Sequence, residues 1–422
     1  MARKMKDSGI EWIGEIPEGW EIVPVRSCFD EVRTKNTDGQ EQNALQFKSG
    51  NIISKTNFNA SMDDYVADTI TNYTVVLPDT VMINGLNLNY DFKSLRVALV
   101  KEKGVITSAY LAIFPDRKKI SPQYATYLFK GYETKMAFHN MGAGIRKTLG
   151  YKEFKNQPLL LPNEKEQNKI SAYLDSKCSH IDIMLSKIRS SIEEYKKFKQ
   201  AVITQAVTKT IYDDFGNPSK FRKLRSLCDV LSKGTTPKDI ETQNDEFYCI
   251  RYLKSENIVS NQLNLNPTFF ITAETNNSLE RSKLNSGDIL FVIAGASIGK
   301  VAITTADFLP ANTNQAVAFI RLSSSYQYAT KYIWYFLQSD VVKQLIALSA
   351  VQSAQPNLSL EDLGAMRLPL PDQMGCLKIT DYLDAKCAEI DRLIAKKEQL
   401  VKELESYKKS LIYEVVTGKR EV

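Results

Sequence analysis

The segment Gly295–Lys300, with the sequence GASIGK, has the residue types and spacing closest to a catalytic motif. A P-loop needs four residues between its glycines and a Ser or Thr after its Lys, but here three residues separate the glycines and Val301 follows. The segment also matches the GxSxG elbow of α/β-hydrolases around Ser297. That fold places its catalytic His after the Ser, whereas His139 and His180 both precede Ser297. We therefore predict a tight glycine turn between two strands, with backbone amides available to a phosphate.

Two further patterns are typical of enzymes that act on DNA. The nuclease pattern PD followed by D/E-x-K occurs twice, as Pro78, Asp79, Asp91 and Lys93 and as Pro115, Asp116, Glu133 and Lys135. Two matches in one region show how permissive this pattern is, so we interpret both as surface charges. The tetrad NPTF at Asn266–Phe269 differs from the NPPF of amino-methyltransferases at Thr268, and a turn at Pro267 is sufficient to explain it.

Polar and basic residues also cluster in segments rich in glycine and other turn formers. Arg and Lys can pair with guanine and Asn or Gln with adenine in the major groove, while Ser, Thr and backbone amides bind phosphates. Such segments recur in both halves of the chain, which favours DNA binding over solvated loops without a ligand. The candidate DNA-binding residues are Lys48, Asn51, Asn87, Arg146, Lys147, Lys233, Thr235, Thr236, Lys254, Asn257, Ser297, Lys300, Asn314 and Gln315.

The elements that must position these loops are organised around two copies of one segment. Pro162–Lys209 aligns without a gap on Pro371–Gly418 at a single offset of 209 residues, which pairs Cys178 with Cys387. A match of this length indicates an internal duplication. Each copy is predicted to form one helix of roughly 44 residues, which at 1.5 Å per residue is about 66 Å long.

Apolar residues step by four and three along each copy, as in the seam of a coiled coil. Lys397 interrupts the second seam. Asn163 and Glu166 resemble a capping box at the start of the first helix, Asp372 offers a cap to the second, and Gly418 suits a helix end. The predicted seam residues are Leu174, Cys178, Ile181, Leu185, Ile188, Ile192, Leu383, Cys387, Ile390, Ile394, Val401 and Leu404.

The composition indicates a soluble protein with more than one domain. The 422 residues are 43% hydrophobic and 25% charged, and the longest apolar run, Ile289–Ala296, is too short to span a bilayer. Six cysteines without CxxC spacing predict a reduced cytoplasmic protein, and two histidines argue against a histidine-based metal site. The net charge of +6 permits nucleic-acid binding without proving it.

In chain order we predict a globular unit, a helix, a second globular unit and a second helix. The expected bounds are 1–161 for the first unit, 162–209 for the first helix, 210–220 for a linker, 221–370 for the second unit and 371–418 for the second helix. Segments rich in β-branched and aromatic residues, such as Val105–Phe114 and Lys300–Thr305, predict strands, and helical stretches follow near Tyr124 and Tyr328. The predicted class is therefore α+β.

The two globular units are also loosely related. Lys48 pairs with Lys254 at an offset of 206, and Gln123–Thr126 pairs with Gln327–Thr330 at an offset of 204. The offset therefore drifts inside the units and stays fixed in the helices, as expected for two divergent recognition surfaces on an invariant frame. Neutral drift of the loops after duplication is the alternative explanation.

Further segments complete the pattern: Lys6–Trp20 (KDSGIEWIGEIPEGW), Leu159–Gln167 (LLLPNEKEQ), Leu368–Asp372 (LPLPD) and the Tyr-Leu-Asp-x-Lys-Cys start of both helices. With them, the whole chain resembles the specificity subunit (HsdS) of type I restriction-modification systems. The resemblance implies two target recognition domains of mixed α/β structure, separated by two long antiparallel coiled-coil helices, with an internal pseudo-twofold duplication. Each domain would read one half of a bipartite double-stranded DNA target, and the helices would set the unread spacer.

The same resemblance implies a non-catalytic chain that works in host defence with catalytic partners. Two methyltransferase subunits would bind S-adenosylmethionine and modify adenine, and two motor-nuclease subunits would use ATP and magnesium. No cofactor, metal or membrane is expected for this chain. One departure from the family pattern affects the expected partner contacts: Glu166 and Gln167 match it, whereas the second copy has Gly375 and Cys376.

A non-enzymatic coiled-coil scaffold or interaction protein without preference among DNA sequences is the alternative function. The target bases depend on how the loops hold a few side chains, so the target does not follow from the sequence.

Overall fold

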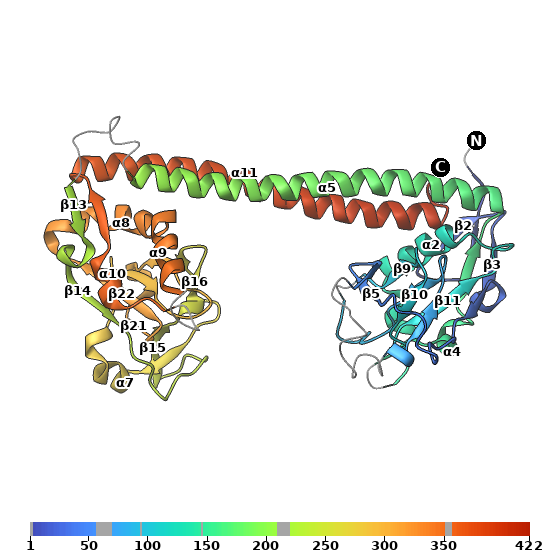
Figure 1. Cartoon of the computed structure of the whole chain (residues 1–422), viewed down its shortest axis with the longest axis horizontal. Helices are drawn as coiled ribbons and strands as arrows, with labels where there is room; N and C mark the ends of the chain where they lie inside the picture. Colours follow the sequence, from blue (N-terminus) through green and yellow to red (C-terminus); the bar gives the residue numbers. More distant parts are fainter. Residues whose placement is uncertain (1–2, 56–69, 93–94, 145–146, 209–219, 351–356) are drawn as a thin grey trace. The chain divides into compact units, whose positions relative to one another are not determined.

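The computed structural model describes residues 3–55, 70–92, 95–144, 147–208, 220–350 and 357–422. The chain divides into two compact units. Unit 1 consists of Met1–Ile188 and Gln399–Val422, and unit 2 consists of Arg189–Glu398 (Figure 1). Unit 1 therefore combines two separate parts of the sequence, whereas unit 2 is one continuous segment.

Unit 1 is built from short strands and a few helices. Its strands are β1 (Met5–Asp7), β2 (Glu15–Pro17), β3 (Glu21–Pro24), β4 (Phe29–Glu31), β5 (Leu45–Lys48), β6 (Asn51–Ser54), β7 (Thr74–Val76), β8 (Val81–Ile83), β9 (Val97–Leu99), β10 (Gly104–Ile106), β11 (Leu111–Pro115) and β12 (Pro158–Leu161). Its helices are η1 (Val25–Ser27), α2 (Pro122–Thr134), α3 (Ala137–Met141), α4 (Tyr151–Phe154) and the first part of α5 (Glu164–Val207).

Unit 2 repeats this composition of elements. Its strands are β13 (Lys220–Lys223), β14 (Cys228–Lys233), β15 (Tyr248–Leu253), β16 (Ile258–Val259), β17 (Gln262–Leu263), β18 (Phe270–Thr272), β19 (Ile289–Val292), β20 (Val301–Ile303), β21 (Ala311–Thr313), β22 (Val317–Leu322) and β23 (Arg367–Leu370). Its helices are η2 (Leu224–Leu227), η3 (Ser255–Asn257), α7 (Ala273–Ser278), η4 (Glu280–Ser282), η5 (Ala306–Phe308), η6 (Ser324–Ala329), α8 (Thr330–Leu337), α9 (Asp340–Ala350), α10 (Leu360–Ala365) and the first part of α11 (Gln373–Val416).

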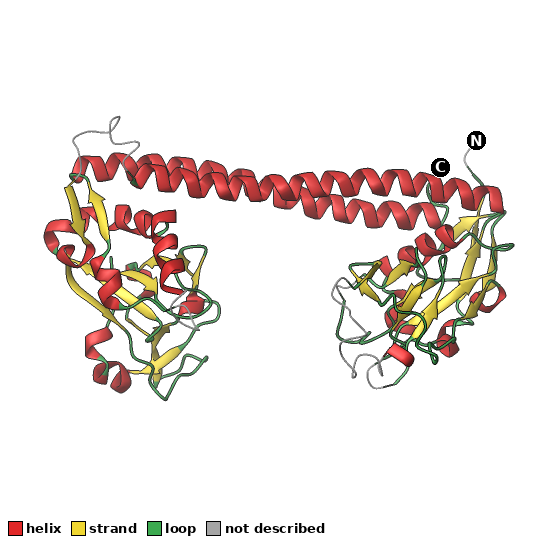
Figure 2. Ribbon diagram, in the orientation of Figure 1, coloured by secondary structure: helices red, strands yellow, loops and turns green. Residues whose placement is uncertain are grey.

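Both units have the same central sheet. In unit 1 the strand order is β4-β11-β8-β9, in unit 2 it is β14-β22-β19-β20, and all neighbours in both sheets are antiparallel. Figure 2 shows strands together with helices in each unit. Each unit also has a two-stranded sheet, β3-β12 in unit 1 and β13-β23 in unit 2, that precedes the long helix. The predicted α+β class and internal duplication are thus confirmed.

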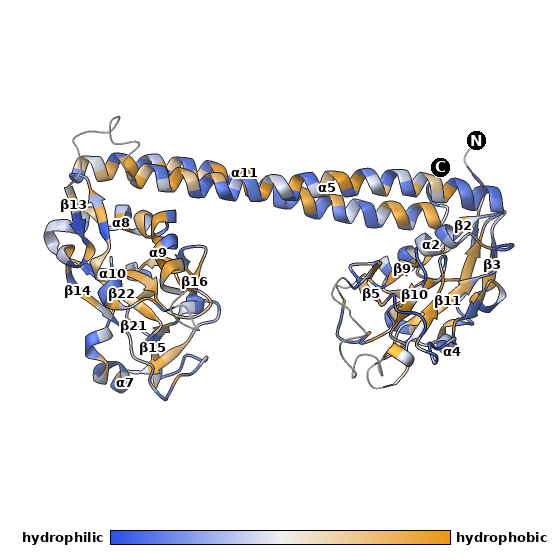
Figure 3. Cartoon of the chain, viewed as in Figure 1, coloured by the Kyte–Doolittle hydropathy of each residue, from blue (hydrophilic) through white to orange (hydrophobic). Residues whose placement is uncertain are grey.

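The inner strands of both central sheets, β8 and β11 in unit 1 and β19 and β22 in unit 2, are largely buried. Figure 3 shows that the sheets of both units are rich in hydrophobic residues. In unit 2, Ile289 and Phe291 of β19 join the core cluster that contains the helices, while Leu290 and Val292 join a second cluster on the other face. Successive side chains of a strand point to opposite faces of the sheet. A strand that is buried on both faces is therefore expected to have an unbroken run of apolar residues, as β19 does.

The two long helices run antiparallel to each other within each unit. In unit 1, Lys408 of α11 forms an ion pair with Asp182 of α5 at 2.6 Å. In unit 2, Lys199 of α5 forms an ion pair with Asp391 of α11 at 2.7 Å. Each ion pair is the copy of the other at the helix offset of 209, so the duplication extends to individual side-chain contacts.

The predicted seam residues are all at least partly buried. Ile188, Ile394, Val401 and Leu404 are partly buried, and the remaining seam residues are buried. Lys397, which interrupts the seam, places its ammonium group 5.5 Å from the centre of the Tyr195 ring in unit 2. A cation over an aromatic face is favourable, which accounts for a lysine at this position.

The helix starts differ in part from the predicted capping box. The Asn163 side chain caps α5 by accepting from the Glu166 amide at 3.0 Å, and the Asp372 side chain caps α11 by accepting from the Gly375 amide at 2.8 Å. The Glu166 carboxylate, however, accepts from Trp20 Nε1 at 3.0 Å and pairs with Arg3, so it secures the amino-terminal segment instead. The predicted capping box is therefore wrong in its second half.

Other local predictions have mixed outcomes. The β-rich segment Val105–Phe114 contributes to two strands, because a turn at Thr107–Tyr110 separates β10 from β11. The predicted glycine turn between β19 and β20 is confirmed. Gly418 follows α11 with a φ of 71°, as predicted for a helix end. Most of the expected linker, including Gly216–Pro218, lies outside the described residues.

Among the described residues, no helix is both long and apolar enough to cross a bilayer.

Candidate nucleic-acid interface

The central sheet of unit 2 brings candidate loops together at one of its ends. β14 ends at Lys233 opposite Ala318, near the start of β22, and β19 ends at Val292 opposite Val317. The segment after β14, the segment before β22 and the β19–β20 turn therefore lie at the same end. The Ile293 amide donates to the Ala316 carbonyl at 2.9 Å, which joins the last two directly.

The segment that follows Lys233 is packed against the segment that precedes β22. The Thr235 amide donates to the Thr313 carbonyl at 3.2 Å, and a Cβ on Gly234 would lie 1.8 Å from that same oxygen. Glycine is therefore required at position 234 by close backbone approach. The buried Tyr252 hydroxyl donates to the Thr235 carbonyl at 2.8 Å, and burial raises the pKa of Tyr252 to about 12, which keeps this donor protonated. Thr235 and Thr236 are exposed on this supported backbone.

Lys254 and Asn257 lie nearby but have internal roles. β15 runs parallel to β21 with Leu253 opposite Thr313, which brings the following residue, Lys254, to the same end of the unit. The Lys254 ammonium lies 3.5 Å from the centre of the Phe269 ring. The Asn257 side chain is 1% exposed, and it bonds the Lys254 amide and the Asn264 and Pro267 carbonyls. We therefore remove Asn257 from the residues proposed to contact DNA.

The β19–β20 turn contains Ser297 and Lys300. Gly295 and Gly299 have φ values of 86° and 88°, a conformation that favours glycine. The turn leads directly into β20, whereas a nucleophile elbow leads into a helix, so the hydrolase pattern at Ser297 has the wrong structural context. Ser297 and Lys300 are partly exposed, as is Asn314, while Gln315 is exposed.

Unit 1 has the equivalent arrangement at the same end of its sheet. There the connection between β8 and β9 corresponds to the β19–β20 turn but is longer. The Leu149 amide donates to the Gly85 carbonyl at 2.9 Å, and the Leu88 amide donates to the Lys147 carbonyl at 3.2 Å. These bonds join two segments that the sequence singled out separately, and both Asn87 and Lys147 are exposed on them. Arg146 lies outside the described residues.

The remaining candidates of unit 1 flank the β5–β6 hairpin. Lys48 is opposite Asn51, and both are exposed. Ser49 and Gly50, which connect them, have φ values of 49° and 73°. A Cβ on Gly50 would lie 3.0 Å from the Leu95 Cβ, so the tip of this hairpin lies against the β8–β9 connection.

The lysines of these loops are available to an external anion. Among the described residues, no ion pair involves Lys48, Lys147, Lys233 or Lys300. In contrast, the residues of the nuclease patterns have internal partners: Asp79 pairs with Arg117 at 2.6 Å, and Asp116 pairs with Lys119 at 3.2 Å. The described part of the chain contains no cluster of carboxylate, His or Cys side chains suited to a metal ion, and Lys93 lies outside it.

Sequence reasoning missed the residues that hold the β8–β9 connection in place. Arg96 is 1% exposed, and its guanidinium donates to the Asn84 and Leu86 carbonyls, both at 2.9 Å. Glu133, part of one nuclease pattern, accepts from the Arg96 amide at 2.5 Å. A single arginine beside a strand has no distinctive spacing. The available signal in the sequence was the pair of aromatic residues Tyr90 and Phe92, which closely follow the candidate Asn87. Both rings are exposed in the structure.

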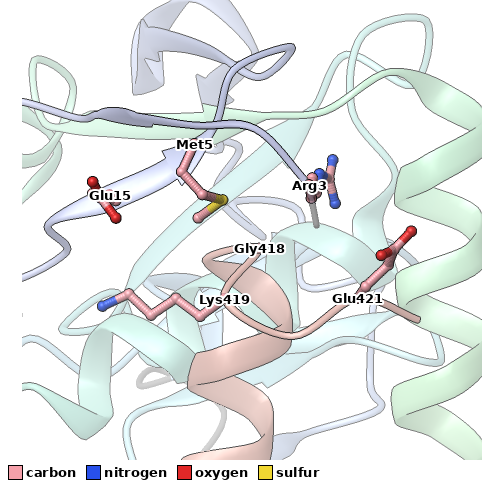
Figure 4. Close-up of a pocket in the computed structure, with 6 residues that line it drawn as sticks. All are labelled: Arg3, Met5, Glu15, Gly418, Lys419 and Glu421. Atoms are coloured by element: carbon pink, nitrogen blue, oxygen red, sulfur yellow. The ribbon is translucent and has the colours of Figure 1, made fainter. Parts of the chain in front are cut away.

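A shallow cavity of about 480 Å³ in unit 1 is not part of this interface. It lies between β1, β2 and the segment that follows α11, and it is lined by Arg3, Met5, Glu15, Gly418, Lys419 and Glu421 (Figure 4). Its basic and acidic side chains alternate, and none of the candidate DNA-binding residues lines it.

The start of the second long helix has Gly375 and Cys376 where the first has Glu166 and Gln167, and packing within each unit explains the change from Gln167 to Cys376. Gln167 is 2% exposed and bonds the Ser121 amide and the Lys119 and Pro162 carbonyls. At the equivalent position, Cys376 is 1% exposed and its thiol lies 3.7 Å from the Pro371 carbonyl. Burial raises the pKa of Cys376 to about 12, so the thiol stays neutral. The Gln167 and Cys376 side chains therefore serve packing within their own units rather than contact with a partner.

Comparisons with known proteins agree with this architecture. Residues 217–403 match the family model described as the type I restriction modification DNA specificity domain. The MjaVIII and putative MjaX specificity subunits of Methanocaldococcus jannaschii are 23% and 22% identical, each over 96% of this chain and over 93% and 95% of their own lengths. A chain solved in work on complex assembly and conformational transition of the type I R-M system has a TM-score of 0.72, with 14% identity, 96% of this chain and 99% of that chain covered. The HsdS subunit from Thermoanaerobacter tengcongensis has a TM-score of 0.52, with 15% identity, 96% of this chain and 98% of that chain covered. Together with the duplicated sheets and helices, these matches show that the chain is similar to the specificity subunits of type I restriction-modification systems over nearly its whole length.

Proposed function

We propose that this chain is the sequence-specific DNA-binding subunit of a type I restriction-modification complex, in which each unit reads one half of a bipartite target. The observation that carries the proposal is the equivalent position of the candidate loops in the two units. In both, the loops lie at the same end of the same sheet and carry exposed lysine, amide or hydroxyl side chains. Lysines suit phosphates and guanine, and Asn or Gln suits adenine.

The residues proposed to contact DNA are the candidates from the sequence without Asn257, which is buried; Arg146 among them lies outside the described residues. Lys254 is proposed only as a phosphate contact, because its position is fixed by Phe269. The other proposed contacts are Lys48, Asn51, Asn87, Arg146, Lys147, Lys233, Thr235, Thr236, Ser297, Lys300, Asn314 and Gln315. The corresponding target recognition domains are residues 1–161 and 221–370.

The long helices are proposed to set the unread spacer and to bind the catalytic partners. Both α5 and α11 continue without a break from one unit into the other, which suits a spacer of fixed length. The proposed partners are two methyltransferase subunits with S-adenosylmethionine and two motor-nuclease subunits with ATP and magnesium. The chain itself would perform no chemical step, and its relatives are named as specificity subunits.

A domain replacement tests the proposal. Residues 221–370 are exchanged for the equivalent part of a relative, and methylated adenines are mapped in cells that carry the partner subunits. One half-site should change while the other half-site and the spacer stay the same. A change in both half-sites, or methylation without sequence preference in the unaltered protein, would overturn the proposal.

A further inference from the structure

Residues 84–92 of the β8–β9 connection of unit 1 are held by a buried arginine. The Arg96 guanidinium donates to the carbonyls of Asn84, Leu86 and Asp91, and it also lies 3.7 Å from the Asp91 carboxylate. Hydrogen bonds from the two terminal nitrogens offset part of the cost of burying this guanidinium, whereas Nε has no partner among the described residues. One side chain thus fixes three points of the segment 84–92.

The rest of the segment is equally well ordered by hydrogen bonds. Asn87 has a φ of 52°, and its carbonyl accepts from the amides of Tyr90 and Asp91 at 3.1 and 3.0 Å. His139 bonds the Asp91 carbonyl through Nε2 at 3.1 Å, so this nitrogen carries the ring proton. The Phe92 ring stacks on the His139 ring with centroids 5.1 Å apart and an interplanar angle of 12°.

This ordered segment presents two aromatic rings to solvent. Tyr90 is 72% exposed and Phe92 is 57% exposed. Exposed rings of this size contribute little to the core, although aromatic side chains carry much of the energy of binding surfaces. A segment that is held rigidly while it exposes two rings is therefore suited to contact with another molecule.

The surroundings of the segment indicate DNA as that molecule. Lys147 bonds the segment through its backbone and is itself exposed, and the hairpin that carries Lys48 lies against its far side at Leu95. Both lysines lack an ion pair within the described chain, so they are available to phosphates. Aromatic and other apolar side chains contact thymine methyl groups or enter between base steps.

The equivalent turn of unit 2 has no counterpart to these rings. Residues 293–300 are shorter than the connection in unit 1, and their sequence IAGASIGK contains no aromatic residue. The two units therefore use the same position in the sheet for different contact chemistry.

We propose that Tyr90 and Phe92 contact bases in the half-site read by unit 1, with Arg96 as the positioning residue. This inference rests on the proposed function and names side chains that decide the specificity of one half-site. The target is first identified from the adenines that the unaltered complex methylates. Binding is then measured for the chain reconstituted with its methyltransferase subunits, on duplexes with the full target or with either half-site scrambled.

The double variant Tyr90→Ala, Phe92→Ala should weaken binding to the full target by about 10-fold or more, as expected for loss of aromatic contacts with bases. Scrambling the half-site of unit 1 should then weaken binding no further, whereas scrambling the other half-site should weaken it as in the unaltered complex. Both side chains are exposed, so thermal unfolding should not change. The matched control Phe221→Ala removes an exposed ring from β13 and should leave binding intact.

A ring-retaining variant separates ring contact from general disturbance. Tyr90→Phe should keep the affinity within about threefold of the unaltered complex, because the ring is preserved. Equal sensitivity of the double variant to both scrambled half-sites, or an unchanged affinity, would overturn the inference while leaving the proposed function intact. Absence of any sequence preference in the unaltered complex would instead refute the proposed function.

Discussion

Glu133 is a carboxyl group whose surroundings favour its neutral form. Burial raises its pKa to about 7, against the opposing effects of the Arg96 amide and of the charges of Arg96, Lys130 and Lys409. The folded protein therefore binds this proton more tightly than the unfolded chain. The contribution of Glu133 to the free energy of unfolding is therefore fully present below about pH 4.5, and it is lost as the pH rises through about 7.

Replacing Glu133 by Gln should therefore stabilise unit 1 at high pH only. The amide keeps an oxygen that can accept from the Arg96 amide, and it removes the buried charge. At pH 8 the variant should be more stable by on the order of 2 kcal/mol, while at pH 4.5 the two proteins should be similar. Denaturant unfolding at both pH values measures this, and a difference independent of pH would contradict the assigned cause.

Lys147 of unit 1 and Lys300 of unit 2 lie in the candidate loops, so the role of a positive charge can be tested in each unit separately. Each Ala variant should weaken DNA binding and reduce the slope of log K against log salt by about one if the lysine contacts a phosphate. The preferred target should not change, because phosphate contacts carry no sequence information. Lys118 is an exposed lysine beyond the other end of β11, so Lys118→Ala is the matched control and should keep the full slope. Equal slopes in all variants would mean that Lys147 and Lys300 are merely solvated.

At the scale of the elements, the helices were predictable because their residues act at short range and at fixed spacing. The apolar spacing and the constant offset of 209 already predict two long helices of equal length, as α5 and α11 are. The recognition loops were less predictable, because their shape depends on distant residues. Arg96 orders the segment 84–92 through backbone carbonyls, and Gly234 is set by the approach of Thr313. Neither contact leaves a periodic pattern in the sequence.

The paired ion contacts of the helices can be tested as two copies of one interaction. Asp182–Lys408 and Asp391–Lys199 are partly exposed, so each should contribute only about 0.5 kcal/mol. Asp182→Lys should destabilise the protein, and the added change Lys408→Asp should restore most of the loss. The same cycle at Asp391 and Lys199 should give a similar coupling energy in denaturant unfolding. Additive effects in both cycles would show that the contacts do not contribute to helix register.

At the scale of the whole molecule, the duplication separates what is shared from what differs. The central sheets and the ends of the long helices are equivalent in the two units, whereas the loops at one end of each sheet differ in length and composition. Under the proposed function, a new half-site could arise by changes in these loops without altering the sheets and helices. The helices would then decide how the two half-sites are spaced.

If helix length sets the unread spacer, insertions must be made in both helices together. Within each unit α5 is held in register with α11 by an ion pair, so lengthening one helix alone would break one of these contacts. Seven residues inserted after Ile188 in α5 and seven after Glu398 in α11 preserve the apolar seam. They lengthen each helix by about 10 Å, which corresponds to at most about three base pairs at 3.4 Å per step.

The expected result is a target with unchanged half-sites and a spacer longer by up to about three base pairs, read from methylated adenines in cells that carry the partner subunits. Insertion of two residues at the same points is the control. It rotates each helix by about 200° and turns the seam away from its partner, so it should abolish methylation rather than lengthen the spacer. Methylation of the original target by the seven-residue variant would show that some part of the complex other than these helices determines the spacer.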